Sequence, residues 1–405
     1  MTLSVLGDVL RGVETGKSFQ TAEVLARPDQ LGVLKVSAVS WNAFRADQAK
    51  LVVNHQPDDR HRVRAGDLII SRANTRELVG AVVRVSQDYP LRLLSDKTLR
   101  LVIDATKADP DYLLLALRTE RARAHIEANA TGTSDSMRNI SQGVIASIPI
   151  WIPRLSVQRR IAARLKAKLA DVETARRAAQ AQVADADALR LAIYREVFAG
   201  LADADFVPIR RLAQTTSGTT PSRGRKDYWD PPAHPWVKTA EVAFAPITKT
   251  QEAISTRALA ECSLSLLPVG TVLVAMYGQG KTRGQSAVLH VPATINQACF
   301  AVLPSDVLDS EYLQCWLQSS YQALRALSDA RGGNQSNLNG AMLGDFRVPV
   351  VSPRRQLDVV RSIAHATGVV DQLRAAAQSR LADLEALPAR LLAAAFNPSN
   401  QGAAP

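Results

Sequence analysis

The fold is decided by residues 156–198, which read SVQRRIAARLKAKLADVETARRAAQAQVADADALRLAIYREVF. This stretch holds neither glycine nor proline and is rich in Ala, Leu, Arg, Gln and Glu, which are strong helix formers. Its apolar residues, from Ile161 to Val197, recur three or four positions apart and form one stripe of a helix. A helix of this length is roughly 65 Å long. The Ala-rich stripe favours close packing against a second long helix, as in a coiled coil.

A second stretch of the same kind runs from about Arg355 to Phe396. Gln158 aligns with Gln356, and Phe198 with Phe396, so the two stretches match without a gap. Pro388 lies inside the second stretch and is expected to kink or interrupt the helix. Each stripe needs a partner surface, and the simplest arrangement is one antiparallel pair within the chain.

The duplication extends beyond the helices, because matching residues recur in the same order at a nearly constant offset of about 200 residues. The stretch 66–70 (GDLII) matches 270–274 (GTVLV), and 111–113 (DYL) matches 311–313 (EYL). Both 66–70 and 270–274 read as a turn glycine followed by a short buried strand. Residues 111–126 and 311–327 each read as an amphipathic helix.

The predicted fold class is α+β, with an internal two-fold repeat in which two mixed α/β domains alternate with two long helices. We name the first domain module 1 and the second module 2. The expected segments are residues 1–153 (module 1), 154–204 (first long helix), 205–353 (module 2), 354–396 (second long helix) and 397–405 (a disordered tail).

The chain is strongly basic, with a formal net charge of +11 and a pI of about 9.8. A polyanion such as DNA is the natural partner of such a protein, although a merely basic soluble protein has the same composition. No apolar run is long enough to cross a membrane, and no secretory signal is visible at the start. Cys262, Cys299 and Cys315 have no paired spacing and are expected to be buried thiols in a reducing cytoplasm. The six histidines are scattered, so no metal site is expected.

The order of several motifs resembles the specificity subunit of Type I restriction-modification systems. Residues 139–142 (NISQ), 148–153 (IPIWIP) and 158–161 (QRRI) resemble the family's exit from a target-recognition domain into a spacer helix. Residues 337–339 (NLN), 348–350 (VPV) and Gln356 form a second copy, and residues 217–221 (SGTTP) with 236–239 (WVKT) resemble the entry to such a domain. Module 1 departs from that entry pattern, since it has TGKS at residues 15–18.

This resemblance implies a non-catalytic DNA reader without a cofactor. Each module would be a target-recognition domain that contacts one half of a bipartite, gapped site in double-stranded DNA, with half-sites roughly 10 bp apart. The two helices would form an antiparallel spacer and would dock two methyltransferase (modification) subunits. ATP-dependent restriction subunits, which translocate and cleave DNA, would complete the complex.

DNA-reading side chains are expected on loops of the two modules, because Arg pairs with guanine, Asn and Gln pair with adenine, and Lys and Arg hold phosphates. Any single candidate can instead be an ordinary solvated loop residue. The candidates are Lys17, Arg72, Asn74, Arg76, Arg138, Thr219, Arg223, Arg225, Lys226, Tyr228, Tyr277, Gln279, Lys281, Arg283, Arg331, Asn334 and Gln335. A basic cluster at the start of the first long helix is either a solvated face or a contact with phosphate or a partner subunit. It comprises Arg159, Arg160, Arg164, Lys166 and Lys168.

Two other functions remain open from the residues. Gly280-Lys281-Thr282 fits a relaxed phosphate-loop pattern of an ATP-binding enzyme, but such a loop must be followed by a helix, and the next residues read as a strand. A coiled-coil scaffold with protein-binding modules is the other alternative. The chain has no Asn-Pro-Pro-Tyr or Asp-Pro-Pro-Tyr motif of an amino-methyltransferase, so no catalytic role is expected.

Overall fold

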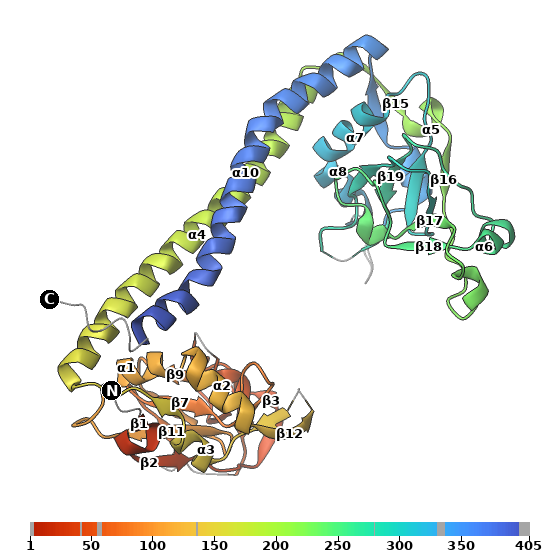
Figure 1. The fold of residues 1–405 in the computed structure, drawn as a ribbon. Helices are drawn as coiled ribbons and strands as arrows, with labels where there is room; N and C mark the ends of the chain where they lie inside the picture. Colours follow the sequence, from red (N-terminus) through yellow and green to blue (C-terminus); the bar gives the residue numbers. More distant parts are fainter. Residues whose placement is uncertain are drawn as a thin grey trace. The chain divides into compact units, whose positions relative to one another are not determined.

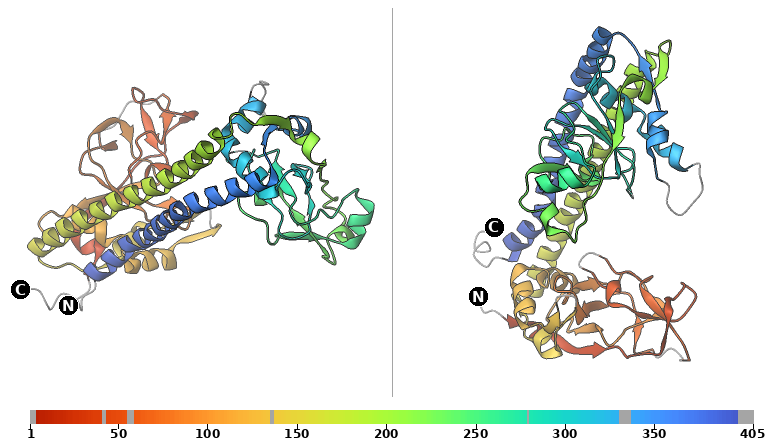
Figure 2. Two further views of the ribbon diagram at one scale, coloured as in Figure 1. Left: turned by 90° about the horizontal axis from the view of Figure 1, so that it is seen from above. Right: turned by 90° about the vertical axis from the view of Figure 1, so that its right-hand side faces the viewer.

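The computed structural model describes residues 4–40, 43–54, 59–134, 137–278, 280–329 and 337–396. The chain divides into two compact units. Unit 1 comprises Met1–Ala178 and Arg380–Pro405, and unit 2 comprises Ala179–Ser379. Each unit therefore holds one module and parts of both long helices (Figures 1 and 2).

Module 1 is built from short elements in the order β1 (Ser4–Val5), η1 (Leu6–Val9), β2 (Leu10–Thr15), β3 (Thr21–Leu25), β4 (Gly32–Leu34), η2 (Val36–Ala38), β5 (Ala49–Val52), β6 (Arg62–Val63), β7 (Leu68–Ser71), β8 (Ala73–Asn74), β9 (Val82–Arg84), β10 (Tyr89–Leu93), β11 (Thr98–Ile103), α1 (Pro110–Ala116), α2 (Glu120–Asn129), β12 (Thr131–Ser134), β13 (Met137–Asn139), α3 (Gln142–Ala146) and β14 (Pro149–Ile150).

Module 2 has the order β15 (Asp205–Pro208), α5 (Ile209–Leu212), β16 (Thr215–Ser217), η3 (Lys226–Tyr228), β17 (His234–Val237), η4 (Thr239–Glu241), β18 (Glu252–Ile254), α6 (Thr256–Glu261), β19 (Val272–Ala275), β20 (Ser286–Val288), β21 (Thr294–Ile295), β22 (Cys299–Val302), α7 (Ser310–Ser319), α8 (Tyr321–Asp329), α9 (Gly340–Gly344) and β23 (Arg347–Val350). The long helices are α4 (Leu155–Ala199) and α10 (Pro353–Phe396).

The sheets of the two modules correspond. An antiparallel sheet runs β2-β11-β7-β9 in module 1 and β16-β22-β19-β20 in module 2. The strand pairs β4–β10 and β17–β21 are both parallel, and β1–β14 matches β15–β23. Module 1 also holds the sheet β12-β13-β8 and a longer sheet β3-β5-β4-β10-β6, where module 2 has β18-β17-β21.

The strand after each turn glycine is buried on both faces, as its continuous apolar sequence predicts. In β7, Leu68 and Ile70 point into a core cluster shared with helices α1 and α4, whereas Ile69 points into a second cluster. Strand β19 divides its side chains between two clusters in the same way. Gly66 and Gly270 precede these strands with φ of 86° and 85°, a left-handed conformation that glycine adopts without strain.

Parts of the two long helices pack together inside each unit. In unit 1, Ala162 and Leu165 near the start of α4 share a core cluster with Leu392 near the end of α10. In unit 2 the late part of α4 meets the early part of α10 through two ion pairs, Arg190–Asp371 at 3.2 Å and Asp187–Arg374 at 2.7 Å. Both units therefore bring the beginning of one helix beside the end of the other.

A buried glutamine ties each module to the helix that follows it. Gln158 Oε1 accepts from the Asp109 backbone N–H at 2.9 Å, and Gln158 Nε2 donates to the carbonyls of Lys107 and Pro153. Gln356 makes the same three bonds, from Asp309 and to Val307 and Val351. Both side chains are almost completely buried. The glutamines therefore fix the first turn of each long helix against its module.

Aromatic contacts join each module to the end of the helix that follows the other module. The ring of Phe396 in α10 lies 5.2 Å from Tyr112 of module 1. Phe198 in α4 lies 5.5 Å from Tyr312 and 5.1 Å from Trp316 of module 2. The repeat is therefore also a repeat of three-dimensional contacts.

The interruption expected at Pro388 is not found: helix α10 continues to Phe396, with Leu392 buried in a core cluster of unit 1 and Leu391 packed against it. A second local expectation was wrong. The single helices expected over 111–126 and 311–327 are helix pairs, α1 with α2 and α7 with α8. The Thr119 hydroxyl caps α2 by accepting from Ala122 N. The tail 397–405 lies outside the described residues. No helix in the described ranges is long and apolar enough to span a membrane.

Candidate nucleic-acid interface

One end of the antiparallel sheet in module 1 carries exposed cations. Strands β2, β11 and β7 lie side by side, with Leu99 paired to both Thr15 and Ile70. Lys17 follows the end of β2, Arg72 follows the end of β7, and Lys97 precedes β11. The Arg72 backbone N–H donates to the Lys97 carbonyl at 2.9 Å, and all three side chains are exposed. We name this end, with the loops described next, edge 1.

Strand pairing adds a distant segment to edge 1. Strand β13 pairs with β8, so that Arg138 lies opposite Asn74, and the Ile140 N–H donates to the Arg72 carbonyl at 2.9 Å. The predicted loops 72–76 and 131–139 therefore form one surface. Arg138 also donates to the Gly132 carbonyl at 3.1 Å, which ties its guanidinium to β12.

Two edge 1 candidates are engaged within the module. Asn74 is buried, and its amide bonds the Val36 carbonyl, the Ser71 hydroxyl and the Thr75 N–H. Its side chain therefore shapes the loop and is turned away from any base edge. Arg76 is exposed and lies 3.9 Å from the carboxylate of Glu127 in α2.

At the corresponding end of module 2, which we name edge 2, the described residues next to the strand ends are mainly neutral. Thr219 follows β16 and its N–H donates to the Ile295 carbonyl at 3.1 Å, while Met276, the residue after β19, donates to Ala298 at 2.8 Å. The Leu338 N–H donates to the Met276 carbonyl at 3.0 Å, repeating the Ile140–Arg72 bond of module 1. Tyr277 is 43% exposed, and exposed Gln297 accepts a hydrogen bond from the Thr220 hydroxyl.

The segment with Gly280, Lys281 and Thr282 connects two antiparallel strands. It joins β19 to β20, which pair along Val272–Val288. Two side chains of helix α8 bond the backbone of this segment. Tyr321 Oη donates to the Lys281 carbonyl at 2.6 Å, and Arg325 donates to the Gly280 carbonyl at 2.7 Å. No helix follows the lysine to present its N-terminus, so the phosphate-loop interpretation lacks its required geometry. Lys281 is exposed, whereas Arg283 is 9% exposed.

The loop 219–228 of module 2 packs its arginines on aromatic rings. Arg223 lies 3.9 Å from the ring of Trp229 and 5.1 Å from that of Trp236, and it bonds Glu252 Oε2 at 2.5 Å. Arg225 lies over the ring of Tyr228 at 4.3 Å. Cation–π contacts of this kind stabilise a loop more when the ring is partly buried.

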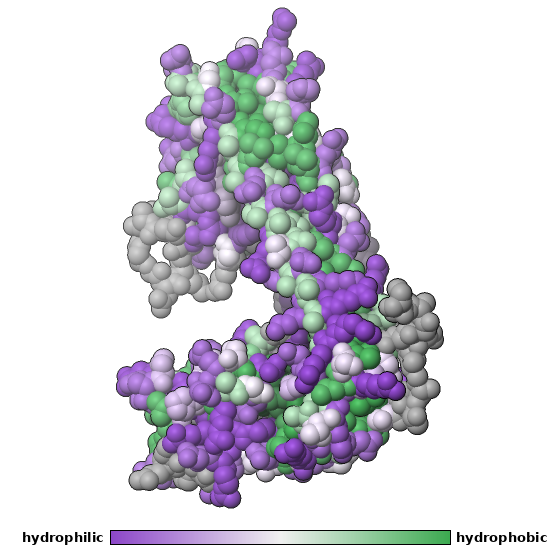
Figure 3. Space-filling view, turned by 90° about the vertical axis from the view of Figure 1, so that its left-hand side faces the viewer, coloured by the Kyte–Doolittle hydropathy of each residue, from purple (hydrophilic) through white to green (hydrophobic). Residues whose placement is uncertain are grey.

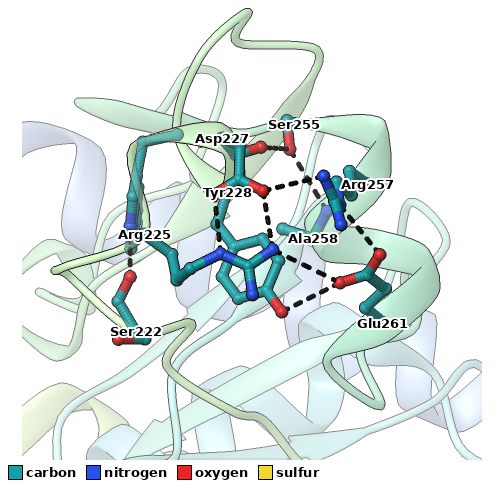
Figure 4. A network of polar contacts seen from close by, with 9 residues as sticks. Ser222, Arg225, Asp227, Tyr228, Ser255, Arg257, Ala258 and Glu261 are labelled. Atoms are coloured by element: carbon teal, nitrogen blue, oxygen red, sulfur yellow. Dashed lines mark hydrogen bonds and ion pairs between the residues drawn. The ribbon is translucent and has the colours of Figure 1, made fainter.

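A network of four charged side chains closes this loop (Figure 4). Arg225 contacts both oxygens of Asp227 at 2.8 and 2.6 Å, and Arg257 bridges Asp227 and Glu261. Tyr228 Oη also donates to Glu261 at 3.0 Å. The bidentate bond from Arg225 lowers the pKa of Asp227 to about 2. Arg223 and then Lys238 lower the pKa of Glu252. Any DNA phosphate must compete with these carboxylates for Arg223 and Arg225.

Lys226 differs from its arginine neighbours. Its side chain is exposed, and no ion pair involving it occurs within the described part of the chain. Gln279, Arg331, Asn334 and Gln335 lie outside the described residues. Sequence reasoning missed Lys97 and Gln297, since neither was assigned to a strand end. The pairing of β11 and β22 with their neighbours is what places them on the two edges.

Within the described ranges, no group of three or more His, Cys, Asp or Glu side chains could hold a metal ion. Cys299 and Cys315 are buried and Cys262 is half-buried, all as free thiols.

Two curated proteins that are similar in sequence to this chain are Type I restriction enzyme specificity subunits. The chain is 28% identical over 158 residues to the Type I restriction enzyme EcoEI specificity subunit of Escherichia coli, which covers 38% of this chain and 27% of that protein. It is 28% identical over 173 residues to the MjaIX specificity subunit of Methanocaldococcus jannaschii, covering 42% and 39%. The chain thus matches well under half the length of these curated relatives. No family model matches.

Solved structures match over nearly the whole chain. A chain from a study of complex assembly and conformational transition of the type I R-M system superposes with a TM-score of 0.76 at 18% identity, covering 98% of this chain and 97% of that one. The HsdS subunit from Thermoanaerobacter tengcongensis superposes with a TM-score of 0.55 at 19% identity, covering 98% and 96%. The chain is therefore similar in sequence to Type I restriction enzyme specificity subunits, and it has the mixed α/β fold with long helices of the HsdS subunit.

Proposed function

We propose that this chain is the DNA-recognition subunit of a Type I restriction-modification complex. The observation that carries the proposal is that the two modules share their framework hydrogen bonds but differ in the residues of their edges. The bonds of Gln158 recur at Gln356. At the strand ends, by contrast, equivalent backbone hydrogen bonds equate three cations of edge 1 with uncharged residues of edge 2, namely Lys17 with Thr219, Arg72 with Met276 and Lys97 with Ala298. Two equal scaffolds with unlike edges suit a protein that reads two different half-sites of one gapped DNA target, one half-site with each module.

The edges suggest how each half-site is read. Arg72, Arg76 and Arg138 gather on edge 1 around two paired loops, and arginine is the side chain that bonds guanine bidentately. Lys17 and Lys97 flank them as phosphate contacts. On edge 2, Thr219, Tyr277 and Gln297 offer hydroxyl and amide groups. Lys226 and Lys281 are exposed cations without an ion pair among the described residues, whereas Arg223 and Arg225 are exposed but ion-paired.

The long helices are proposed to form an antiparallel coiled coil that spaces the modules and docks two methyltransferase subunits. Large apolar side chains of both helices remain exposed in unit 2, namely Leu189, Leu357, Val369 and Leu373. Figure 3 shows hydrophobic side chains reaching the surface in the upper half of the view. Exposed apolar surface on a coiled coil is typical of a helix face that binds a partner.

The proposed domains are residues 1–153 and 205–353 for target recognition and 154–204 and 354–396 for spacing, in a cytoplasmic protein without its own cofactor. Methylation, ATP use and cleavage belong to the methyltransferase and restriction subunits. The ATP-binding alternative at Lys281 is not favoured, because a strand follows the lysine.

The test is a genome-wide methylation map of the host with and without this gene, followed by the map of a strain carrying Arg72→Ala. We expect deletion to remove one bipartite methylated motif and Arg72→Ala to weaken or relax only one half of that motif. If the set of methylated motifs is the same with and without the gene in a strain that expresses the methyltransferase, the proposal is wrong.

A further inference from the structure

A pocket of about 690 Å³ lies in unit 1 between the sheet, helix α1 and the start of α4. Its lining combines apolar and charged side chains. The side chains that matter are Arg84, Asp111, Leu114, Arg118, Lys166 and Leu169. This volume lies in the range of pockets that hold a ligand or an anchoring side chain of a partner.

The lining has more positive than negative charge. Arg84 bonds Asp111 at 2.5 Å, so this pair is neutral. Arg118 and Lys166 have no carboxylate partner among the residues that the structure describes. Arg118 Nη2 reaches the Val82 carbonyl at 3.4 Å, while its Nε is buried without a hydrogen-bond partner in the described chain. Because no carboxylate of the described chain neutralises Arg118 or Lys166, the pocket is suited to an anion.

Module 2 lacks this charge at equivalent positions. Strand register equates Arg84 with Val288, since Leu68 pairs with Arg84 and Val272 with Val288. The shared helix cap at Asp109 and Asp309 equates Arg118 with Gln318, and the shared Gln158 and Gln356 bonds equate Lys166 with Ala364. Gln318 is 7% exposed. The cationic pocket is therefore a property of one half of the repeat.

The pocket lies at the opposite end of the sheet from edge 1. Arg84 pairs with Leu68 at the first residue of β7, whereas Arg72 follows the last residue of that strand. A duplex held on edge 1 therefore does not fill this pocket. Because the lining holds the apolar side chains of Leu114 and Leu169 beside its charged groups, it fits a polypeptide better than a free inorganic anion.

We propose that this pocket receives an acidic side chain, flanked by apolar residues, from a docked methyltransferase subunit. The inference rests on the proposed function. Arg118 and Lys166 bind the carboxylate, and Leu114 and Leu169 contact the flanking residues. Since module 2 has Gln318 and Ala364 instead, two identical subunits bind the chain through non-equivalent contacts, and the subunit on module 1 has the additional ionic contact.

The experiment uses the full chain co-expressed with the methyltransferase subunit of its own system. Arg118→Gln combined with Lys166→Ala gives module 1 the residues of module 2. Native mass spectrometry and sedimentation should show two methyltransferase subunits on the wild-type chain. The variant should bind one of them at least tenfold more weakly, which corresponds to about 1.4 kcal/mol. The complex with one subunit should therefore accumulate on dilution. High salt should reduce the difference, because an ion pair is screened.

The matched control is Arg45→Gln combined with Lys249→Ala, which removes the same two charge types from exposed positions outside the pocket and outside the long helices. It should leave the assembly unchanged. Because Arg118 is partly buried, Lys166→Glu at an exposed position gives a second variant that tests the charge without disturbing the core.

The outcomes separate the two claims. If the wild-type chain does not bind the methyltransferase at all, the proposed function fails and the inference fails with it. If the wild-type complex forms and both pocket variants match the control, only the inference is overturned. Variants that assemble normally but bind the gapped duplex more weakly would mean that the pocket holds a DNA phosphate, which also overturns it.

Discussion

In module 1 the antiparallel sheet ends in Lys17, Arg72 and Lys97, whereas the equivalent end of module 2 carries Thr219, Tyr277 and Gln297. Away from this end, the modules repeat each other down to single hydrogen bonds, such as those of Gln158 and Gln356. Positions that hold the backbone are thus repeated, and positions on the exposed edge are not. The comparison indicates that one framework is used twice to present two different chemical surfaces.

The modules also differ in how they hold the end of a long helix. Phe198 is 5% exposed and contacts both Tyr312 and Trp316. Phe396 is only half-buried, and the position equivalent to Trp316 is Ala116. Module 2 therefore binds its helix end through a larger aromatic cluster.

The largest expected effect is on this aromatic contact. Phe198→Ala should lower the free energy of unfolding of unit 2 by about 3–5 kcal/mol, as for other buried phenylalanines. Phe396→Ala should lower that of unit 1 by roughly half as much, because its ring is partly exposed. Urea unfolding followed by hydrogen exchange in each module measures both. Equal losses would contradict the difference between the two modules.

A smaller and equal effect is expected at the glutamines. Gln158→Ala and Gln356→Ala each leave one backbone N–H and two carbonyls without their buried partner, which costs about 1–3 kcal/mol. The same urea experiment should give matching values for the two variants. A loss of stability in only one of the two variants would show that the two glutamines do not contribute equally to the stability of their modules.

The edges predict different salt dependence. Lys97→Ala should weaken binding of the gapped duplex by roughly threefold to tenfold and reduce the slope of log affinity against log salt by about 0.9, the value for one lost phosphate contact. Gln297→Ala on edge 2 is the matched variant and should leave that slope unchanged. Fluorescence anisotropy over a range of salt concentrations measures both slopes. Equal slopes for the two variants would show that Lys97 on edge 1 does not contact a phosphate.

The smallest effect concerns thiol reactivity, and it reports on module 2 alone, since all three cysteines lie there. Burial raises the pKa of both Cys299 and Cys315 to about 12, so both stay protonated and unreactive at pH 8. Only Cys262 should react rapidly with a disulfide reagent in the native chain. Rapid reaction of more than one thiol would show that module 2 opens readily, and Cys262→Ser should remove the fast phase.

The helices and the repeat were predictable because the spacing of apolar residues and the local composition can be read directly from the sequence. Helix α4 begins and ends within one residue of the stretch 156–198 that predicted it. The surfaces were harder to predict, because strand pairing places residues from distant segments together. Arg138 opposite Asn74 and Lys97 beside Arg72 depend on such pairing. A sequence reading also assigned Asn74 to the exterior, since an asparagine in a polar loop gives no sign that its amide is used internally.

The aromatic contact between Phe396 and Tyr112 also has a consequence for biosynthesis. Unit 2 is continuous in the chain, but unit 1 consists of Met1–Ala178 and Arg380–Pro405. During translation, the first part of unit 1 is made before the last turn of α10, which packs into its core. About 200 residues are translated in between, which takes roughly 10–40 s at usual elongation rates. Unit 2 can therefore finish folding first. A stop codon just before Leu391 would leave the oldest part of the nascent chain with an open core, while the younger part is complete.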